Sequence, residues 1–392
     1  MFGKYKKRII GIILMIVVLV GLLIPAQAYL LRRVDHNQIR LEGFHLEKKN
    51  SLDVVVMGAS ETYYGFIADE AYKKTGITSY PYAFQYNPVT LWKYELKEIL
   101  KRQKPKVLVV EVNGAGYGAG IDDNKVYSEA AIRILSDSMR LSNDKKVMLN
   151  ELRDVRKDGV MSYYWPFLKF HSQPIYNGWR RDIIELNKRG YSPLKGVFSK
   201  IRTKPHNREL AISKNIKSVN MDKNSEKALR EFVHLSKKSG IKHVLFVRFP
   251  HKITNERQML RYQRYLRVGE VIRSCGGEFM DFSNYRDQMD ILPDKDFVDT
   301  EHLNLYGAKK FTYHLMQYLK TKYKLQPTKL SADDMKKWET SVRYIEEYSK
   351  YYEEYPRKHP DFITSKKRFK DEEKMIKELE TRISRAKERK SE

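Results

Sequence analysis

Short apolar runs and longer stretches with helical spacing alternate along this chain. Four short runs are typical of buried strands, because β-branched and aromatic residues fill them and turn residues follow: 52–57, 107–112, 243–249 and 278–282. Apolar residues recur with helical spacing in four longer stretches: 88–102, 225–238, 254–274 and 305–320. Strands that alternate with helices predict βαβ units, and hence an open α/β fold whose parallel sheet of at least four strands is buried on both faces.

The N-terminal 31 residues form an apolar segment behind a basic flank. Four basic residues lie between Lys4 and Arg8, and no charge follows from Ile9 to Ile24. The apolar stretch continues towards Leu31, so that it exceeds the ~20 residues that a bilayer-spanning helix needs. We expect a single-pass membrane anchor over 1–31, with its N-terminus inside and the rest of the chain outside the cytoplasm. The alternative is a signal peptide cleaved after Ala28, which would export the same chain.

Three further regions flank or interrupt the α/β domain, which is expected over 51–325. The polar stretch 32–50 has the composition of a linker. An aromatic and basic insertion over about 115–224 leaves the sheet at the edge where ligands bind in such folds, so we expect a cap over the site or a packing subdomain. The charge-rich tail 326–392 predicts one or two solvated helices, broken around Pro356 and Pro360. A partner-binding arm or short coiled coil is the alternative for this tail.

Composition and charge narrow the classes of protein. A hydrophobic content of 41% supplies a core and excludes a chain that is disordered throughout. The single cysteine, Cys275, excludes an internal disulfide and a cysteine-based metal site, and we expect no cofactor and no metal. A net charge of +26 indicates either an anionic partner, such as a membrane surface or a phosphate-bearing wall polymer, or a soluble Lys-rich background. The sequence contains no nucleic-acid-binding motif, so nucleic acid is not an expected partner.

The candidate chemistry lies after the first strand and before the last helix. Ser60 follows a Gly-Ala turn at the end of the first apolar run, where backbone N–H groups can meet an oxyanion. His302 can act as the base that a serine nucleophile needs, and Asp299 can fold back to hold its imidazole. Each motif alone is common, since an Asp cap with a nearby histidine has the same spacing. Their pairing at one edge of the sheet predicts a Ser-His-Asp site.

Two segments of the chain resemble the terminal motifs of the SGNH/GDSL hydrolase superfamily: Val-Val-Val-Met-Gly-Ala-Ser-Glu at 54–61 and Asp-Thr-Glu-His-Leu-Asn-Leu-Tyr-Gly-Ala at 299–308. With its N-terminal anchor, the chain looks like the membrane-anchored DltD-like branch found in Gram-positive bacteria. The similarity covers about residues 50–322. It implies a three-layer α/β/α, flavodoxin-like fold with Ser60 as nucleophile, His302 as base and Asp299 as the residue that orients it.

The resemblance also implies an oxyanion hole built from the serine N–H, a glycine N–H and an asparagine side chain. Asn113 follows the second strand and matches that asparagine in chain order, although its context departs from the usual Gly-x-Asn-Asp. The glycine block has no match, and Asn87 is its stand-in. For both residues the alternative is an asparagine that shapes a turn. In the insertion, His171 and Trp179 are candidates for contact with a sugar or an acyl carrier.

Two glutamates near these motifs receive no catalytic role. Glu61, directly after Ser60, is expected to cap the following helix. Glu111 is a carboxylate inside an apolar strand, which indicates either a structural pairing with a buried base or a position near the cleft.

The implied function is serine-dependent transfer of an acyl group, of the O-acetyl or D-alanyl type, to or from a cell-envelope polymer such as teichoic acid or polysaccharide. The resemblance implies a partner of the multi-pass MBOAT type of O-acyltransferase. Three alternatives stay open: a non-catalytic anchored scaffold or polymer-binding subunit, a simple carbohydrate esterase, and a lipase. Transferases and hydrolases use the same triad and differ in how they exclude water, which the triad residues alone do not distinguish.

Overall fold

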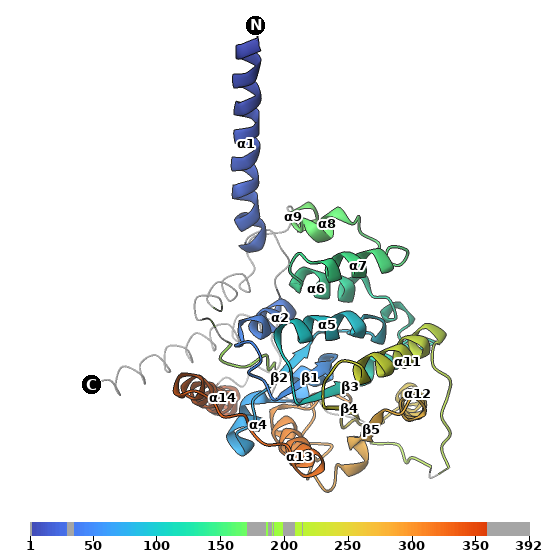
Figure 1. Cartoon of the computed structure of the whole chain (residues 1–392). Coiled ribbons are helices and arrows are strands. Elements are labelled where there is room, and N and C mark those ends of the chain that lie inside the picture. The colour runs from blue at the N-terminus through green and yellow to red at the C-terminus, as the bar shows by residue number, and fades with distance from the viewer. Residues whose placement is uncertain are drawn as a thin grey trace, which may run out of the picture.

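The computed structural model describes residues 2–29, 35–170, 186, 190, 192–198, 208–213 and 215–358 (Figure 1). Its strands are β1 (Val54–Gly58), β2 (Ser79–Ala83), β3 (Val107–Glu111), β4 (His243–Arg248) and β5 (Glu278–Asp281). Its helices are α1 (Phe2–Tyr29), α2 (His36–Leu46), α3 (Ser60–Gly65), α4 (Ala68–Thr75), α5 (Trp92–Arg102), α6 (Glu129–Ser138), α7 (Asn143–Glu151), α8 (Met161–Tyr164), α9 (Phe167–Phe170), α11 (Lys223–Lys237), α12 (Glu256–Ser274), α13 (Leu305–Tyr323) and α14 (Ala332–Lys358). Short 3₁₀ helices lie at Val89–Leu91, Asn113–Ala115, Asp123–Lys125 and Phe282–Tyr285.

The five strands form one parallel sheet in the order β2-β1-β3-β4-β5. Val55 of β1 pairs with Tyr80 on one side and with Leu108 on the other. The chain therefore reverses its direction across the sheet between β2 and β3. The carboxyl ends of β1 and β3 flank this switch point, where ligands bind in such sheets. The prediction of an α/β fold with a parallel sheet is confirmed.

The fifth strand, β2, is not predicted by the hydrophobic pattern. Its sequence, Ser-Tyr-Pro-Tyr-Ala, contains Pro81, and a proline argues against a strand in the interior of a sheet. β2 lies at the edge of the described sheet, next to β1. The proline is tolerated there because one side of an edge strand needs no ladder of hydrogen bonds.

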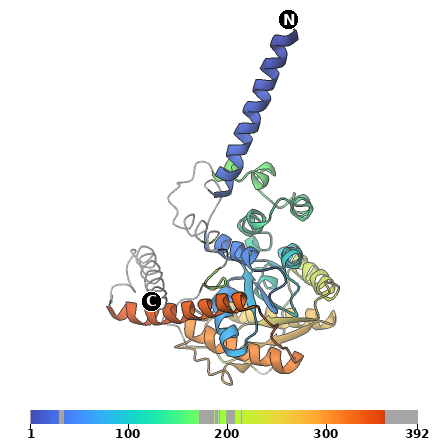
Figure 2. The ribbon, with the colours of Figure 1, turned by 60° about the vertical axis from the view of Figure 1, so that its left-hand side comes forward.

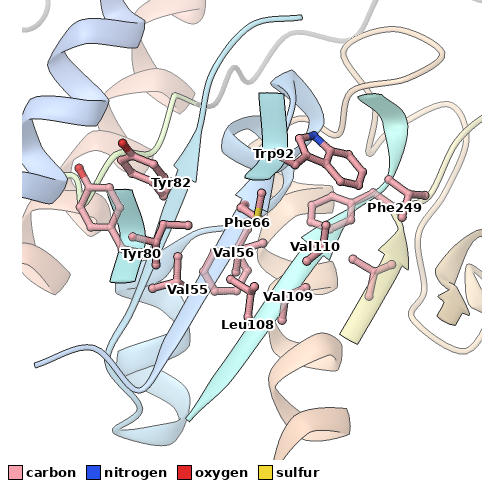
Figure 3. Packing of buried hydrophobic residues seen from close by; sticks show 14 of the residues in the cluster. Val55, Val56, Phe66, Tyr80, Tyr82, Trp92, Leu108, Val109, Val110 and Phe249 are labelled. Atoms are coloured by element: carbon pink, nitrogen blue, oxygen red, sulfur yellow. The ribbon is translucent and has the colours of Figure 1, made fainter. Parts of the chain in front are cut away.

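Helices cover both faces of the sheet, as Figures 1 and 2 show. α11 packs against α5 and α12 on one face, and α13 packs against α3 and α4 on the other. Because both faces are covered, strand residues such as Val55 and Val109 are fully buried, and the strands run apolar without alternation. Figure 3 shows these side chains packed with Phe66, with Trp92 of α5 and with Phe249, which follows β4.

Residues 32–50, predicted as a linker, contain helix α2, which packs against β2 and α6. Arg40 of this helix is buried, and its guanidinium lies 3.6 Å from the centroid of the Tyr63 ring. The Arg40 Nε donates to the Gly196 carbonyl at 2.7 Å. The linker prediction is wrong because polar side chains in this stretch find buried partners in distant segments, which composition does not show.

The described part of the insertion packs outside the sheet layers. α6 lies on α2, α7 lies on α5, and α8 and α9 lie further out (Figure 1). Residues 192–198 instead return towards α3, where the Phe198 N–H donates to the Tyr63 carbonyl at 3.0 Å. His171 and Trp179 lie outside the described residues, so their contact with a substrate stays a prediction.

Helix α14 of the charged tail packs against α4 instead of being solvated on all sides. Trp338 stacks on Tyr72 with ring centroids 4.9 Å apart, and Trp338, Ser341 and Ile345 are buried. Their spacing places these three residues on one face of the helix. The helix runs through Pro356 without a break and is described as far as Lys358. Pro360 lies outside the described residues, so a break there stays a prediction.

Helix α1 projects away from the remainder of the fold (Figures 1 and 2), and its large apolar side chains from Ile9 to Leu22 are exposed. Across the described residues, no helix reaches the combination of length and apolarity that a membrane crossing needs. Attachment to a membrane stays a prediction.

Candidate active site

Ser60 lies where β1 ends and α3 begins. The strand is buried up to Gly58, and Ala59 is the last residue before the helix. A side chain on Gly58 would collide with the Glu111 side chain and the Thr62 hydroxyl, so glycine is the residue that lets β3 approach this turn. The turn leaves Ser60 half-buried at the carboxyl edge of the sheet, with its backbone N–H in the first turn of α3.

Ser60, His302 and Asp299 form a chain of hydrogen bonds. The Ser60 Oγ lies 2.8 Å from the His302 Nε2, and the His302 Nδ1 lies 2.9 and 3.0 Å from the two Asp299 carboxylate oxygens. Because an ionised carboxylate only accepts, Nδ1 carries the hydrogen and Nε2 has a lone pair that faces the serine hydroxyl. This is the tautomer that a general base requires. The His302 side chain is 19% exposed, so the base can be reached from solvent.

The loop that carries Asp299 and His302 is held at both ends. The Asp299 Oδ1 accepts the backbone N–H groups of Glu301 and His302, each at 2.9 Å, which folds the loop back on the carboxylate. Asn304 then caps α13 by accepting the Tyr306 N–H at 3.0 Å. The spacing of the motif is thus that of an Asx turn followed by a helix cap, and it brings Asp299 back to the imidazole.

Aromatic rings lie along one side of the triad, and the sequence patterns did not select them. The Tyr64 ring lies 4.7 Å from the His302 ring, and the Phe198 ring lies edge-on to Tyr64 at 5.9 Å. His36 stacks on Phe198 at 4.8 Å. Tyr64 follows Ser60 by one helical turn, a spacing that could have indicated it. Phe198 and His36 come from distant segments, so only the fold brings them to the site.

Asn87, predicted as an oxyanion donor, is used elsewhere. It is fully buried, and its Nδ2 donates to the Gly58 carbonyl at 3.0 Å and to Glu95 at 2.6 Å. Both hydrogens of this amide are therefore engaged, and none is left for an oxyanion. The prediction for Asn87 is wrong, and the alternative holds: this asparagine fixes the turn that precedes Ser60.

Asn113, the other predicted oxyanion donor, lies beside the residue that follows Ser60. Its Nδ2 donates to the Glu61 Oε1, and its Oδ1 accepts from the Tyr265 hydroxyl at 2.5 Å. An amide nitrogen carries two hydrogens, so one remains after the contact with Glu61. The role of Asn113 in an oxyanion hole stays a prediction.

A group of buried ionisable side chains adjoins the triad, and we call it the carboxyl layer: Glu61, Glu111, His251 and Arg248. Glu111 accepts the Ala59 N–H at 3.0 Å and the Asn113 N–H at 2.5 Å. Glu61, expected to cap a helix, points into this layer, where its Oε2 lies 2.8 Å from the His251 Nε2. The sequence patterns missed His251, because a lone histidine after a strand carries no distinguishing signal.

Burial governs the proton affinities in the carboxyl layer. It raises the pKa of Glu61 to about 7, while the nearby His302 acts in the opposite direction. Burial and the neighbouring Glu61 raise the pKa of Glu111 well above its usual range. Burial and the Arg248 guanidinium lower the pKa of His251 well below its usual range, so its imidazole is neutral at pH 7.

The arrangement supplies a nucleophile, a base and an orienting carboxylate within hydrogen-bonding distance of one another. This set is what acyl transfer through a covalent ester needs. Within the ranges that the structure describes, no group of three or more His, Cys, Asp or Glu side chains is arranged to hold a metal ion.

Comparisons with known proteins give only distant matches. No family model and no curated protein matches the chain. Among solved structures, it is similar to a variant of Axe2, an acetyl-xylooligosaccharide esterase from Geobacillus stearmophilus, at 11% identity and a TM-score of 0.34, covering 69% of this chain and 94% of that one. It is also similar to a protein from Parabacteroides merdae ATCC 43184 named as a GDSL-like lipase, at 11% identity and a TM-score of 0.31, covering 69% and 97% of the two chains. The assignment of a function therefore rests on the geometry of the site.

Proposed function

We propose that this chain is a serine-dependent acyl-transfer enzyme of the SGNH/GDSL type that acts on ester bonds. The observation that carries the proposal is the hydrogen-bonded chain from Ser60 through His302 to Asp299 at the carboxyl edge of a parallel sheet. A non-catalytic scaffold has no need of a serine, a correctly protonated imidazole and a carboxylate in this order. The geometry therefore favours the enzyme over the scaffold.

The first half of the reaction forms an acyl-enzyme. The Ser60 oxygen attacks the ester carbonyl while the His302 Nε2 takes the hydroxyl proton, and the Asp299 carboxylate stabilises the resulting imidazolium. The tetrahedral intermediate collapses when the bond to the leaving alcohol breaks, and that alcohol takes the proton from His302. Ser60 then carries the acyl group as an ester, and the imidazole is neutral again.

The second half passes the acyl group to an acceptor. An acceptor hydroxyl gives its proton to His302 and attacks the acyl-Ser60 ester, and Ser60 recovers a proton when the ester bond breaks. A polymer hydroxyl as acceptor makes the enzyme a transferase, and water makes it an esterase. Tyr64 lies beside His302, where an acceptor has to approach the base, and Phe198 packs edge-on against Tyr64.

The proposed setting is the outer face of a membrane. The exposed apolar side chains of α1 support attachment there, and the basic residues that precede them support an orientation with the triad outside the cytoplasm. The net charge of +26 supports an anionic acceptor, such as teichoic acid or another envelope polysaccharide. In this setting a membrane partner of the MBOAT type would deliver the acyl group.

The test follows hydrolysis of p-nitrophenyl acetate by the full-length chain in detergent, with intact-protein mass spectrometry of the same samples. We expect serine-dependent release of p-nitrophenolate and a transient gain of one acetyl group on Ser60. Both are absent in Ser60→Ala. The matched control is Asp69→Asn, because the buried Asp69 carboxyl interacts with Lys195 and Glu47 instead of the triad. Equal rates for wild type and Ser60→Ala, with no acetyl-Ser60, would contradict the proposal and favour a binding subunit.

A further inference from the structure

The position of Glu61 in the carboxyl layer indicates a role in catalysis. We propose that Glu61 is a positioning residue for the triad: its carboxylate holds the Asn113 amide and supplies a negative charge that favours protonated His302. This inference rests on the proposed function, because a positioning role has meaning only if Ser60 and His302 carry out acyl transfer.

Both oxygens of Glu61 face polar partners, although its side chain is 1% exposed. The Oε1 accepts a hydrogen bond from the Asn113 Nδ2. The Oε2 lies 2.8 Å from the His251 Nε2, close but not collinear, so this contact is electrostatic rather than an aligned hydrogen bond. Because Glu61 directly follows the nucleophile, these contacts also hold the turn that carries Ser60.

His251 carries its hydrogen on the nitrogen that faces Glu61. Its Nδ1 lies 3.3 Å from an Arg248 guanidinium nitrogen, and a guanidinium only donates, so Nδ1 accepts. The hydrogen of the neutral ring is then on Nε2. Arg248 is held in turn by Asp281 at 3.1 Å, which balances its charge. His251 therefore presents a fixed N–H dipole to Glu61 without adding a positive charge of its own.

The contacts of Glu61 set the direction of the Asn113 amide. Tyr265 donates to the amide oxygen at 2.5 Å, so the amide nitrogen faces Glu61. The backbone N–H of Asn113 is held by Glu111 at 2.5 Å, and the same carboxyl accepts the Ala59 N–H at 3.0 Å. One carboxyl thus joins the ends of β1 and β3, and the free hydrogen of the Asn113 amide has a single direction.

The charge of Glu61 is set by groups from several elements. The titratable and charged side chains that act on it are Glu111 (β3), Tyr117, Arg248 (β4), His251, Arg261 and Tyr265 (α12), and His302. Burial and the neighbouring Glu61 raise the pKa of Glu111 well above its usual range, so Glu111 is neutral at pH 7 and adds no second negative charge beside Glu61. Glu61 changes its charge near neutrality, because burial raises its pKa to about 7.

An ionised Glu61 stabilises the charge that forms during the reaction. When His302 takes the Ser60 proton, it becomes cationic, and its interaction with the Glu61 carboxylate turns favourable. A protonated Glu61 offers no such charge. The contribution of Glu61 to the rate should therefore appear only at a pH at which its carboxyl is ionised.

The experiment compares wild type with Glu61→Gln in hydrolysis of p-nitrophenyl acetate by the full-length chain, from about pH 5.5 to about pH 8.5. We expect the kcat of wild type relative to the variant to rise about tenfold across this range, because one charge is added beside His302. The midpoint of the rise is expected near pH 7. Damage to packing lowers the rate of the variant by the same factor at every pH, so a flat ratio overturns the proposal.

Asp69→Asn is the matched control. Asp69 is also buried, and burial raises its pKa to about 8, but Lys195 and Glu47 are the charges next to it. The ratio of wild type to this variant is expected to stay flat with pH. A tenfold rise here as well would overturn the proposal, since any buried carboxyl would then have the same effect.

A second variant, His251→Leu, carries the test if Glu61→Gln does not fold. Removing the N–H that faces Glu61 raises the pKa of the carboxyl, so the alkaline gain in kcat should move to higher pH. An unchanged midpoint overturns the proposal. Absence of Ser60-dependent turnover at every pH is a different result: it refutes the proposed function itself, and the two failures are thereby distinguished.

Discussion

The triad and the carboxyl layer are neighbours that differ in their access to water. His302 and Asp299 are 19% and 37% exposed, whereas Glu61 and Glu111 are almost fully buried. A nucleophile and its base have to be reached by a substrate, while the groups that hold them gain from a dry surrounding in which hydrogen bonds are stronger. Burial also shifts the proton affinity of the inner groups. The comparison teaches that access and precise placement are supplied by different residues of the same site.

The largest expected effect on the rate comes from a substitution in the triad, which is the more exposed of the two groups. Asp299→Asn keeps the size of the side chain but cannot hold the hydrogen on His302 Nδ1, so Nε2 no longer faces Ser60 as a base. We expect kcat to fall by about 10⁴-fold while the chain stays folded. Steady-state kinetics and circular dichroism measure the two quantities. A loss below about tenfold would mean that Asp299 does not orient the base.

The next effect concerns the carboxyl layer and how it makes the free energy of unfolding depend on pH. The pKa of Glu61 is raised on folding, so the folded state binds its proton more tightly than the unfolded state does. The contribution of the Glu61 carboxyl to the free energy of unfolding is therefore most favourable below the usual glutamate pKa. It falls as pH rises from about 4.5 to about 7. Relative to Glu61→Gln, wild type should lose about 3 kcal/mol across this window. Urea unfolding at several pH values tests this, and equal pH slopes for the two proteins would contradict it.

A substitution at Gly58 tests how the turn before Ser60 packs against the carboxyl layer. A Cβ there would collide with the Glu111 carboxyl and the Thr62 hydroxyl, so Gly58→Ala should destabilise the chain by about 2 kcal/mol and reduce turnover. The matched control is Gly159→Ala, because an added Cβ at Gly159 meets nothing within 4 Å. Chemical denaturation of both variants gives the comparison. Equal stabilities would show that the turn before Ser60 tolerates a side chain.

The smallest expected effect concerns the Tyr64 ring at the exposed side of the site. Tyr64 lies beside His302 and is half-buried, so Tyr64→Leu should raise KM about threefold to tenfold, equivalent to about 1 kcal/mol, with little change in kcat. Tyr313→Leu serves as the control, since Tyr313 is 41% exposed on α13. If kcat falls and KM stays constant, the ring acts on His302 itself rather than on the substrate.

Local patterns predict the parts of this fold in which neighbours in sequence are also neighbours in space. The apolar runs became β1, β3, β4 and β5, and Asp299 folds back on His302 within three residues. Local patterns do not predict β2, because Pro81 is tolerated only at a sheet edge and edge position is not a local property. Local patterns also fail to predict α2. Arg40 lies in a stretch with the composition of a linker, and its burial depends on contacts with the distant residues Gly196 and Tyr63.

The two asparagines show the same limit within the site. Chain order placed both Asn87 and Asn113 at the carboxyl edge of the sheet, and both lie there. Only the contacts distinguish them. Asn87 donates both amide hydrogens, to Gly58 and Glu95, whereas Asn113 donates one and keeps a second hydrogen for another acceptor. Residue type and position in the chain cannot reveal which acceptors surround an amide.

Short-range spacing and turn chemistry are enough to predict the α/β class, the turn that carries Ser60 and the pairing of Asp299 with His302. Only the folded chain shows the order of the sheet, the ring of Tyr64 beside His302 and the burial of Glu61. These depend on contacts between segments far apart in the chain. A carboxyl group acquires an unusual proton affinity only when such contacts remove it from water.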